Sequence, residues 1–350
     1  MLRQLLLSLI LIPLLTACAQ AAPQAASPSA SPTAAPTTAQ AKAKESPAVS
    51  GVKVEKVTLY MGFVPNVQFA PFYVALDKGY FKDEGIDLTL DYGMETDLIK
   101  LLAADQAQFV VGSGDQVILA RSQGLPIVYV MNWYRKFPVA VVSLQPLRTP
   151  QDLKGKKVGI PGQFGATYIG LRGLLYAAKV DEKSVTMPTI GFTQVESLLK
   201  QQVDAAVGYS MNEPLQLKQS GQTPGVIEVS QYIDLVANGL ITNEKTVQEN
   251  PDLIRRVIRA SLRGLRDTLA QPDAAFATTL KAVPEAAKTA EAQRATLEAS
   301  LGFWRADRLG QSDPQSWQTS ARFMKDVGLI TTDVDPSRAF TNEFIPDRLP

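Results

Sequence analysis

The chain of 350 residues is 45% hydrophobic and 20% charged, the composition of a globular protein with room for about two domains. Lys and Arg total 35 against 34 Asp and Glu, so the balance indicates neither an acidic tail nor a nucleic-acid-binding surface. There is no histidine, and the only cysteine is Cys18. These counts exclude Ser-His-Asp and Cys-His catalysis, metal sites built from histidine or clustered cysteines, and an intrachain disulfide.

Residues 1–17 are typical of an export signal. Arg3 supplies a basic start, and the apolar run 5–15 is shorter than the ~20 residues that span a bilayer. The sequence LTAC at 15–18 resembles the bacterial lipobox, in which a peptidase cuts before the cysteine and its sulfur receives diacylglycerol. We therefore expect Cys18 to be lipidated and to hold the protein on the cell membrane, at the extracytoplasmic face (periplasmic or cell-surface). An ordinary secretory signal with a chance cysteine is the alternative.

Residues 18–50 are rich in Ala, Pro, Ser and Thr, and no charged residue occurs between Arg3 and Lys42. A segment with so few large apolar side chains cannot bury a core. We expect it to be a disordered tether between the lipid anchor and the folded body.

Strand-like and helix-like patterns alternate in the first half of the folded body. The segment IDLTLDY at 86–92 alternates apolar and polar residues as a strand does, whereas residues 96–105 have apolar side chains at helical spacing. The βαβ order predicts a parallel-type α/β sheet. The expected strands are 54–61, 86–92, 109–111, 127–131 and 140–143, and the expected helices are 70–78, 96–105 and 117–122.

The same alternation restarts after residue 150 and ends in a helical tail. A return strand is expected at 235–242, and Asn250 followed by Pro251 begins a long amphipathic helix. The other expected strands are 157–160, 186–190, 205–209 and 226–229, and the helices between them are 168–179, 194–201 and 215–220.

These elements predict two α/β lobes that are joined by two crossings of the chain. Residues 52–143 and 236–340 are assigned to lobe 1, and residues 144–235 to lobe 2. In open α/β sheets, ligands bind at the carboxyl ends of the strands. Two such edges that face each other form a cleft that can close by hinge motion.

Three stretches resemble one known family. PFYVALDKGYFKDEGIDLTL at 71–90, LKGKKVGIPG at 153–162 and LLKQQVDAAVGY at 198–209 have the order and spacing of the SsuA/THI5-like solute-binding proteins. The resemblance, which covers residues 57–221, implies an α/β type II periplasmic-binding-protein fold with two lobes and a two-crossing hinge. It also implies delivery of a small-molecule ligand to an ABC permease and its ATPase. We expect a monomer with no cofactor, metal or nucleic-acid partner.

Two loops resemble the riboflavin-binding branch of this family. They are FVPNVQFA at 63–70 and GQFGATYIG at 162–170. Binders of thiamine pyrimidines usually carry a histidine after the Pro-Asn pair, where this chain has QFA at 68–70. Riboflavin is therefore the favoured ligand, ahead of a thiamine pyrimidine precursor and of another heterocycle or a sulfonate. A sulfonate needs strong donors, and neither loop contains arginine.

A flat heterocycle is held by aromatic faces and a few placed polar groups, and both kinds of side chain follow the expected strands. Trp133 and Tyr134 are the stacking candidates from lobe 1, with core packing as the alternative. Glu213 is a candidate acceptor for ring N–H groups or ribityl hydroxyls, with a surface carboxylate as the alternative. The ligand-binding candidates are Asn66, Phe69, Tyr92, Glu95, Ser113, Asp115, Trp133, Tyr134, Gln163, Thr167, Tyr168, Tyr209, Asn212, Glu213 and Asn238.

Structural roles compete with binding for several of these residues. Asn66 could form an Asx turn, and Glu95 and Asp115 could stabilise the N-termini of helices. Arg135 and Lys136 follow the aromatic pair and could hold a phosphate, although a solvated rim is the favoured interpretation.

The expected activity is binding without chemistry. Pyrimidine synthases of the resembled family use a histidine, a PLP lysine and a cysteine cluster, whereas this chain has no histidine and its cysteine lies in the lipobox-like sequence. A lipoprotein sensor without transport partners is the other alternative.

Overall fold

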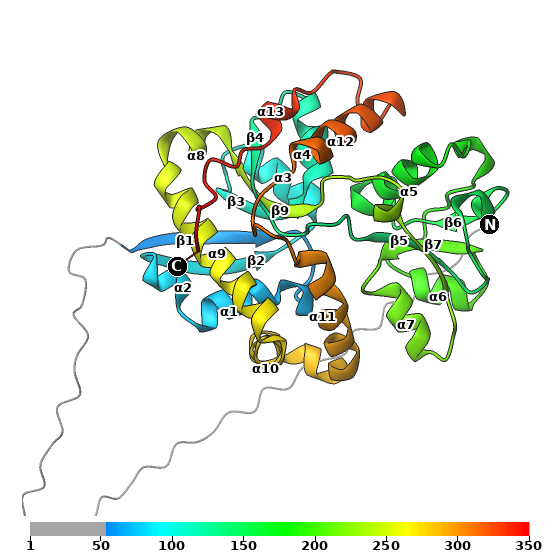
Figure 1. Ribbon diagram of the computed structural model, residues 1–350, viewed down its shortest axis with the longest axis horizontal. Coiled ribbons are helices and arrows are strands. Elements are labelled where there is room, and N and C mark those ends of the chain that lie inside the picture. Colours follow the sequence, from blue (N-terminus) through cyan, green and yellow to red (C-terminus); the bar gives the residue numbers. More distant parts are fainter. Residues whose placement is uncertain (1–53, 350) are drawn as a thin grey trace, which may run out of the picture. The chain divides into compact units, whose positions relative to one another are not determined.

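The computed structural model describes residues 54–349 (Figure 1). The signal peptide, Cys18 and the tether lie outside the described residues, so these expectations stay predictions. The described part contains a five-stranded sheet with the order β2-β1-β3-β9-β4 and a four-stranded sheet with the order β6-β7-β5-β8. We call the first sheet with its helices lobe 1 and the second sheet with its helices lobe 2.

The sheet of lobe 1 is mixed rather than wholly parallel. Strands β1 and β2 pair in parallel, as do β1 and β3, which agrees with the βαβ order. Strand β9 runs antiparallel between β3 and β4 because it returns from lobe 2 and enters beside the end of β3, where Ser113 pairs with Asn238. The strands are β1 (Glu55–Met61), β2 (Ile86–Tyr92), β3 (Phe109–Ser113), β4 (Ile127–Asn132) and β9 (Asn238–Asn243).

The sheet of lobe 2 corrects one expected boundary. Val139–Ser143 was assigned to lobe 1, but this strand, β5, pairs antiparallel with β7 and β8 and is buried throughout. An apolar, β-branched run predicts a buried strand without indicating which sheet it joins. The strand expected at 186–190 forms only isolated bridges, at Thr186 and Thr189. The other strands are β6 (Val158–Gly159), β7 (Ala205–Tyr209) and β8 (Gly225–Glu228).

Helices follow most of the strands, and the C-terminal third is mainly helical. The α-helices are α1 (Ala70–Asp77), α2 (Tyr80–Asp83), α3 (Glu95–Ala103), α4 (Gly114–Ser122), α5 (Gly165–Ala177), α6 (Gln194–Leu199), α7 (Glu213–Gln219), α8 (Glu244–Glu249), α9 (Pro251–Ala270), α10 (Pro272–Ala282), α11 (Ala290–Trp304), α12 (Pro314–Asp326) and α13 (Pro336–Ala339). Short 3₁₀ helices are η1 (Val67–Phe69), η2 (Pro150–Leu153), η3 (Glu182–Ser184), η4 (Val229–Gln231) and η5 (Pro284–Thr289).

The long helix α9 packs on lobe 1. It contacts α1 and α2 through its apolar face, which includes Leu253, Val257 and Leu265. On its polar side, the guanidinium of Arg259 lies 2.5 Å from the carboxylate of Glu84. This helix from the C-terminal third of the chain therefore packs on the helices that follow β1 in lobe 1 (Figure 1).

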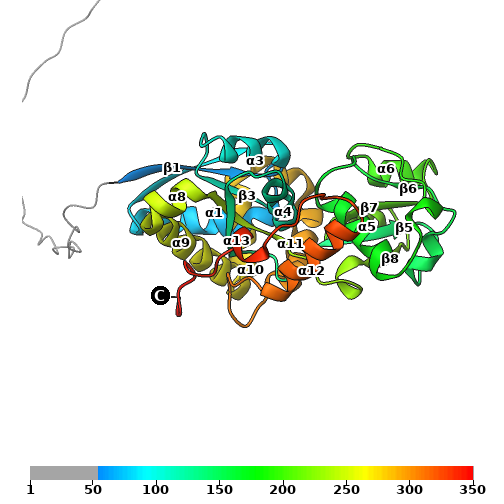
Figure 2. The ribbon, with the colours of Figure 1, turned by 90° about the horizontal axis from the view of Figure 1, so that it is seen from above.

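Helix α12 contacts both lobes, through α4 and α5. Figure 2 shows it running beside α5. The hydroxyl of Ser316 donates to the carboxylate of Asp234 (2.6 Å), and the hydroxyl of Ser320 accepts from the backbone N–H of Val236 (2.9 Å). The chain crossing from lobe 2 to β9 is thus held against α12. Among residues 54–349, no helix is both long and apolar enough to cross a bilayer.

Candidate functional site

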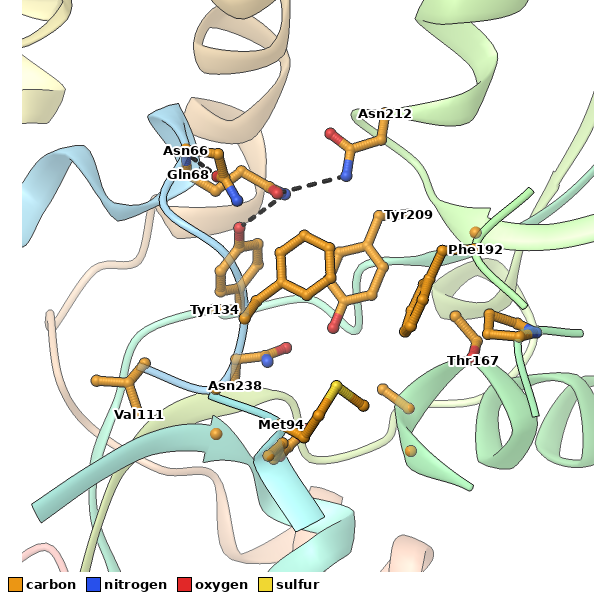
Figure 3. A pocket seen from close by; sticks show the side chains of 18 of the residues that line it. Asn66, Gln68, Met94, Val111, Tyr134, Thr167, Phe192, Tyr209, Asn212 and Asn238 are labelled. Carbon is orange, nitrogen blue, oxygen red and sulfur yellow. Dashed lines mark hydrogen bonds between the residues drawn. The ribbon is translucent and has the colours of Figure 1, made fainter. Parts of the chain in front are cut away.

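A cavity of about 150 Å³ lies between the lobes and is lined from both (Figure 3). Lobe 1 contributes the segment after β1, the start of α3, the end of β3 and the residues after β4. Lobe 2 contributes the loop before α5, the loop before α6 and the turn from β7 into α7. The cavity therefore lies at strand ends, where ligands bind in α/β sheets.

Aromatic rings line the cavity from both sides. The rings of Tyr134 and Tyr209 point into the same space, and Phe192 lies beside them on the lobe 2 side (Figure 3). Phe63 reaches the cavity from lobe 1 and meets Phe192 edge to face, with 6.0 Å between the ring centroids. These rings offer apolar surface to a flat ligand.

Trp133 lines the cavity but belongs mainly to an aromatic cluster. It is 3% exposed, and the rings of Phe69 and Trp304 lie nearly parallel to it at 5.7 and 5.8 Å. The rings of Phe72 and Tyr134 meet it edge to face at 5.3 and 4.7 Å. Its stacking partners are thus protein rings, which favours the packing role over ligand stacking. Within the described part of the chain, its buried indole N–H has no hydrogen-bond partner.

Two glutamate carboxyl groups each pack against a glycine near the end of a strand. Glu95, at the start of α3, accepts hydrogen bonds from the backbone N–H and the hydroxyl of Ser113. A Cβ on Gly112 would lie 2.8 Å from the Glu95 carboxylate. Glu213, at the start of α7, accepts from the backbone N–H of Tyr209 (2.7 Å), and a Cβ on Gly208 would lie 2.1 Å from its carboxyl group. A side chain at either strand position would displace the carboxyl group from the place that it occupies.

Burial raises the pKa of both carboxyl groups. The pKa of Glu95 rises to about 7, first because of burial and second because of the charge of Asp115. Burial also raises the pKa of Glu213 to about 7 and that of Asp115 to about 6. Near neutral pH, these groups can therefore accept a hydrogen bond when ionised or donate one when protonated.

A glutamine bridges the lobes at the edge of the cavity. The side-chain N–H of Gln68 donates to the hydroxyl of Tyr134, and its carbonyl oxygen accepts from the amide of Asn212, each at 3.4 Å (Figure 3). Asn66, in the same loop, forms an Asx turn: its carbonyl oxygen accepts from the N–H of Gln68 (2.8 Å), and its amide donates to the carbonyl of Val64 (2.9 Å). Both residues line the cavity, but it is Gln68, rather than Asn66, whose side chain contacts lobe 2.

Ten of the candidates from the sequence line the cavity. They are Asn66, Phe69, Glu95, Trp133, Tyr134, Thr167, Tyr209, Asn212, Glu213 and Asn238. Their position at strand ends brings them together, and whether they contact a ligand stays a prediction.

Five candidates lie away from the lining, each for a physical reason. The hydroxyl of Tyr92 hydrogen-bonds to that of Tyr73 (3.1 Å), and Tyr168 lies under the guanidinium of Arg172. Ser113 hydrogen-bonds to Glu95, and Asp115 is close enough to affect its pKa, but of the three only Glu95 reaches the cavity. Gln163 is exposed on its loop. A position near a strand end fixes the region but not the direction of the side chain, so the sequence could not separate these residues from the rest.

Several lining residues were not predicted from the sequence. They are Phe63, Gln68, Met94, Phe164, Phe192 and Gln194. Phe63, Gln68 and Phe164 lie in the loops 63–70 and 162–170, which resemble the riboflavin-binding branch of the family. That resemblance could have indicated them as lining residues. Phe192 follows a segment that forms only isolated bridges, and no motif marked it. Residues 54–349 contain no group of three or more His, Cys, Asp and Glu placed to hold a metal ion.

Two α/β lobes with a cavity between their strand ends define the periplasmic-binding-protein class of fold. The periplasmic aliphatic sulphonate binding protein SsuA from Escherichia coli has a similar structure, with a TM-score of 0.66. The match covers 85% of this chain and 97% of that one at 12% identity. The expected two-lobed α/β fold is thereby confirmed.

The chain belongs to the NMT1/THI5-like family, whose model matches residues 66–275. It is similar to the riboflavin-binding protein RibY of Chloroflexus aurantiacus, at 42% identity over 84% of this chain and 87% of that protein. It is also similar to the formylaminopyrimidine-binding protein of Halalkalibacterium halodurans, at 31% identity over 67% of this chain and 73% of that protein. The family resemblance read from the sequence is confirmed.

Proposed function

We propose that this protein is the solute-binding component of an ABC importer and that its ligand is riboflavin. The observation that carries the proposal is the cavity between the lobes, which is lined by Tyr134 and Tyr209 together with Glu95 and Glu213. A flat vitamin with one ring N–H group, ring carbonyls and a chain of hydroxyls uses both kinds of contact. The 42% identity with a riboflavin-binding protein over 84% of this chain supports the choice.

The charges of the cavity favour a neutral ligand over a sulfonate. Glu95 and Glu213 line it, and its lining within the described residues includes no lysine or arginine. An anion beside these carboxyl groups would lose its hydration without gaining a cationic partner. A neutral ring that donates hydrogen bonds to the carboxyl groups has no such penalty.

A pyrimidine precursor of thiamine is the second candidate. A cavity of about 150 Å³ suits a single ring, and the formylaminopyrimidine-binding relative shares 31% identity with this chain. The amino group of a pyrimidine would donate to Glu213 as a flavin N–H would. Riboflavin is preferred because the riboflavin-binding relative is more similar and matches more of the chain.

The proposed role is delivery rather than catalysis. The chain has no histidine, and its cysteine is Cys18, in the lipobox-like sequence. The lipid on Cys18 would hold the monomer at the extracytoplasmic face of the membrane, where the ligand-bound form meets the permease and its ATPase. A sensor would bind the same ligand, but uptake by cells would not depend on it.

Riboflavin fluorescence tests the ligand directly. Titration of riboflavin with the purified protein should quench its fluorescence at submicromolar concentrations, and excess formylaminopyrimidine should not reverse the quenching. Absence of quenching, together with calorimetric binding of the pyrimidine, would replace riboflavin by the second candidate. Deleting the gene and measuring uptake of labelled riboflavin separates transport from sensing, because a sensor's loss leaves uptake intact.

A further inference from the structure

A second and larger hollow adjoins the cavity between the lobes. It has a volume of about 920 Å³. Both hollows are lined by Phe63, Asn66, Gln68, Phe192, Gln194, Asn212 and Glu213. We call the first hollow the inner cavity and the second the outer groove. Because both Gln68 and Asn212 line the two hollows, their 3.4 Å contact stands at the passage between them.

The inner cavity is too small for the whole of a flavin. A buried cavity of about 150 Å³ in another protein accommodates a molecule the size of benzene. Riboflavin has a tricyclic ring system and a chain with several hydroxyl groups. Even if the lobes shift to admit the rings, the chain must leave the inner cavity, and the outer groove is the space that continues from it.

The outer groove has the chemistry that a polyhydroxyl chain requires. Helix α7 of lobe 2 contributes Gln216 and Gln219, and helix α11 of lobe 1 contributes Gln293 and Thr296. A carboxamide both donates and accepts, so it can pair with a hydroxyl in either sense. Gln216 and Gln219 are exposed, and within the described residues their side chains have no hydrogen-bond partner in the protein.

The side chain of Gln68, which lies between the two hollows, is held only by weak contacts. Both side-chain contacts of Gln68, with Tyr134 and with Asn212, are 3.4 Å long, beyond the usual range for a strong hydrogen bond. A ligand hydroxyl can therefore replace either contact at little cost. The same exchange would keep a link between lobe 1 and lobe 2 through the ligand.

We propose that the outer groove is a subsite for a polyhydroxyl chain, with the ring system in the inner cavity, the chain passing Gln68 and the amides of Gln216 and Gln219 binding its hydroxyls. The inference rests on the proposed function, because it takes the ligand to be a flavin. It adds the place of the chain and the residues that select a flavin with such a chain over the bare ring system.

The test compares riboflavin with lumiflavin, which has the same ring system and a methyl group in place of the chain. Each is titrated with the wild-type protein, with the double variant Gln216→Ala/Gln219→Ala and with the control Gln222→Ala, an exposed glutamine just beyond α7 that lines neither hollow. The wild type and the control should bind riboflavin about tenfold more tightly than lumiflavin, as the loss of one or two neutral hydrogen bonds would predict. The double variant should lose most of this preference by weakening riboflavin binding alone.

Each other outcome has a definite meaning. Equal affinity of the wild type for the two flavins, or a preference that survives in the double variant, overturns the chain subsite while the flavin-binding function stands. Equal weakening of both flavins in the double variant also overturns the subsite, because the two glutamines would then act on the fold. Failure of the wild type to bind either flavin overturns the proposed function itself.

Discussion

The rings of Phe63 and Phe192 meet edge to face across the two lobes, with 6.0 Å between their centroids. Phe63 follows β1 in lobe 1, and Phe192 precedes α6 in lobe 2. They are 41% and 59% exposed, respectively, so neither ring belongs to the core of its lobe. Separation of the lobes would break the contact between them. Both rings line the inner cavity and the outer groove, so the contact lies where the two hollows meet.

Replacing Phe192 should therefore speed release of the ligand. An edge-to-face pair contributes about 0.5–1.5 kcal/mol, so Phe192→Ala should raise the dissociation rate of riboflavin about two- to tenfold. Stopped-flow fluorescence measures this rate. Tyr232→Ala, which removes another exposed aromatic ring outside both hollows, should leave it unchanged. An unchanged rate in Phe192→Ala would show that the ring pair does not control release.

Removing the indole of Trp133 should destabilise the protein strongly. The side chain is 3% exposed and packs among four other rings, so Trp133→Ala should lower the free energy of unfolding by about 3–5 kcal/mol. Urea denaturation of the ligand-free protein measures the loss. A change below about 1 kcal/mol, with a large loss of affinity, would return Trp133 to the ligand-stacking role that the sequence suggested.

The carboxyl groups of the inner cavity should make stability fall as pH rises. Because burial raises the pKa of Glu213 from 4.5 to about 7, the folded state binds more protons than the unfolded state between these values. The free energy of unfolding should therefore decrease from about pH 4.5 to pH 7, and Glu95 adds to the same trend because its pKa is also about 7.

Denaturation curves at several pH values check this trend in the ligand-free protein. Glu213→Gln should flatten the decrease, whereas the control Glu249→Gln, at an exposed position, should leave it in place. A wild-type stability that rises across the same interval would mean that these groups are ionised at little cost in the folded protein.

Phosphorylation of the ligand should weaken binding. Along the two hollows, the charged side chains of the described lining are Glu95, Glu196, Glu213 and Lys200, and Lys200 lies 2.5 Å from Glu196. A phosphate at the end of the chain would meet one exposed cation, Lys200, which already pairs with Glu196, and it would lie near carboxyl groups elsewhere in the lining, so flavin mononucleotide should bind more weakly than riboflavin. Fluorescence titration of both ligands tests this, and added salt should narrow the difference. Tighter binding of the mononucleotide would contradict the assigned charges.

The sequence predicted the alternation of strands and helices because burial patterns repeat locally. The segment IDLTLDY reads as a strand, and it forms β2. The partner of a strand depends on distant segments, which is why Val139–Ser143 was placed in the wrong lobe and why the antiparallel insertion of β9 was missed. Local patterns determine elements, whereas the sheet order depends on the whole fold.

The same division applies to the candidate site. Glu95, Tyr209 and Glu213 were found because they follow strands, and the strand ends meet at the cavity. Tyr92 ends β2 and Tyr168 lies in the first turn of α5, so both were also candidates. Their side chains contact Tyr73 and Arg172, respectively, and not the cavity. Phe192 could not be singled out, since its role depends on Phe63 from the other lobe. The lipid on Cys18 stays a prediction from the sequence.

A crystal structure of the protein grown with riboflavin would show whether the flavin binds between the lobes. We expect the flavin ring system to lie between the lobes, against Tyr134 and Tyr209 and within hydrogen-bonding distance of Glu95 or Glu213. A flavin bound elsewhere on the protein, or a cavity between the lobes that stays empty at saturating riboflavin, would contradict it.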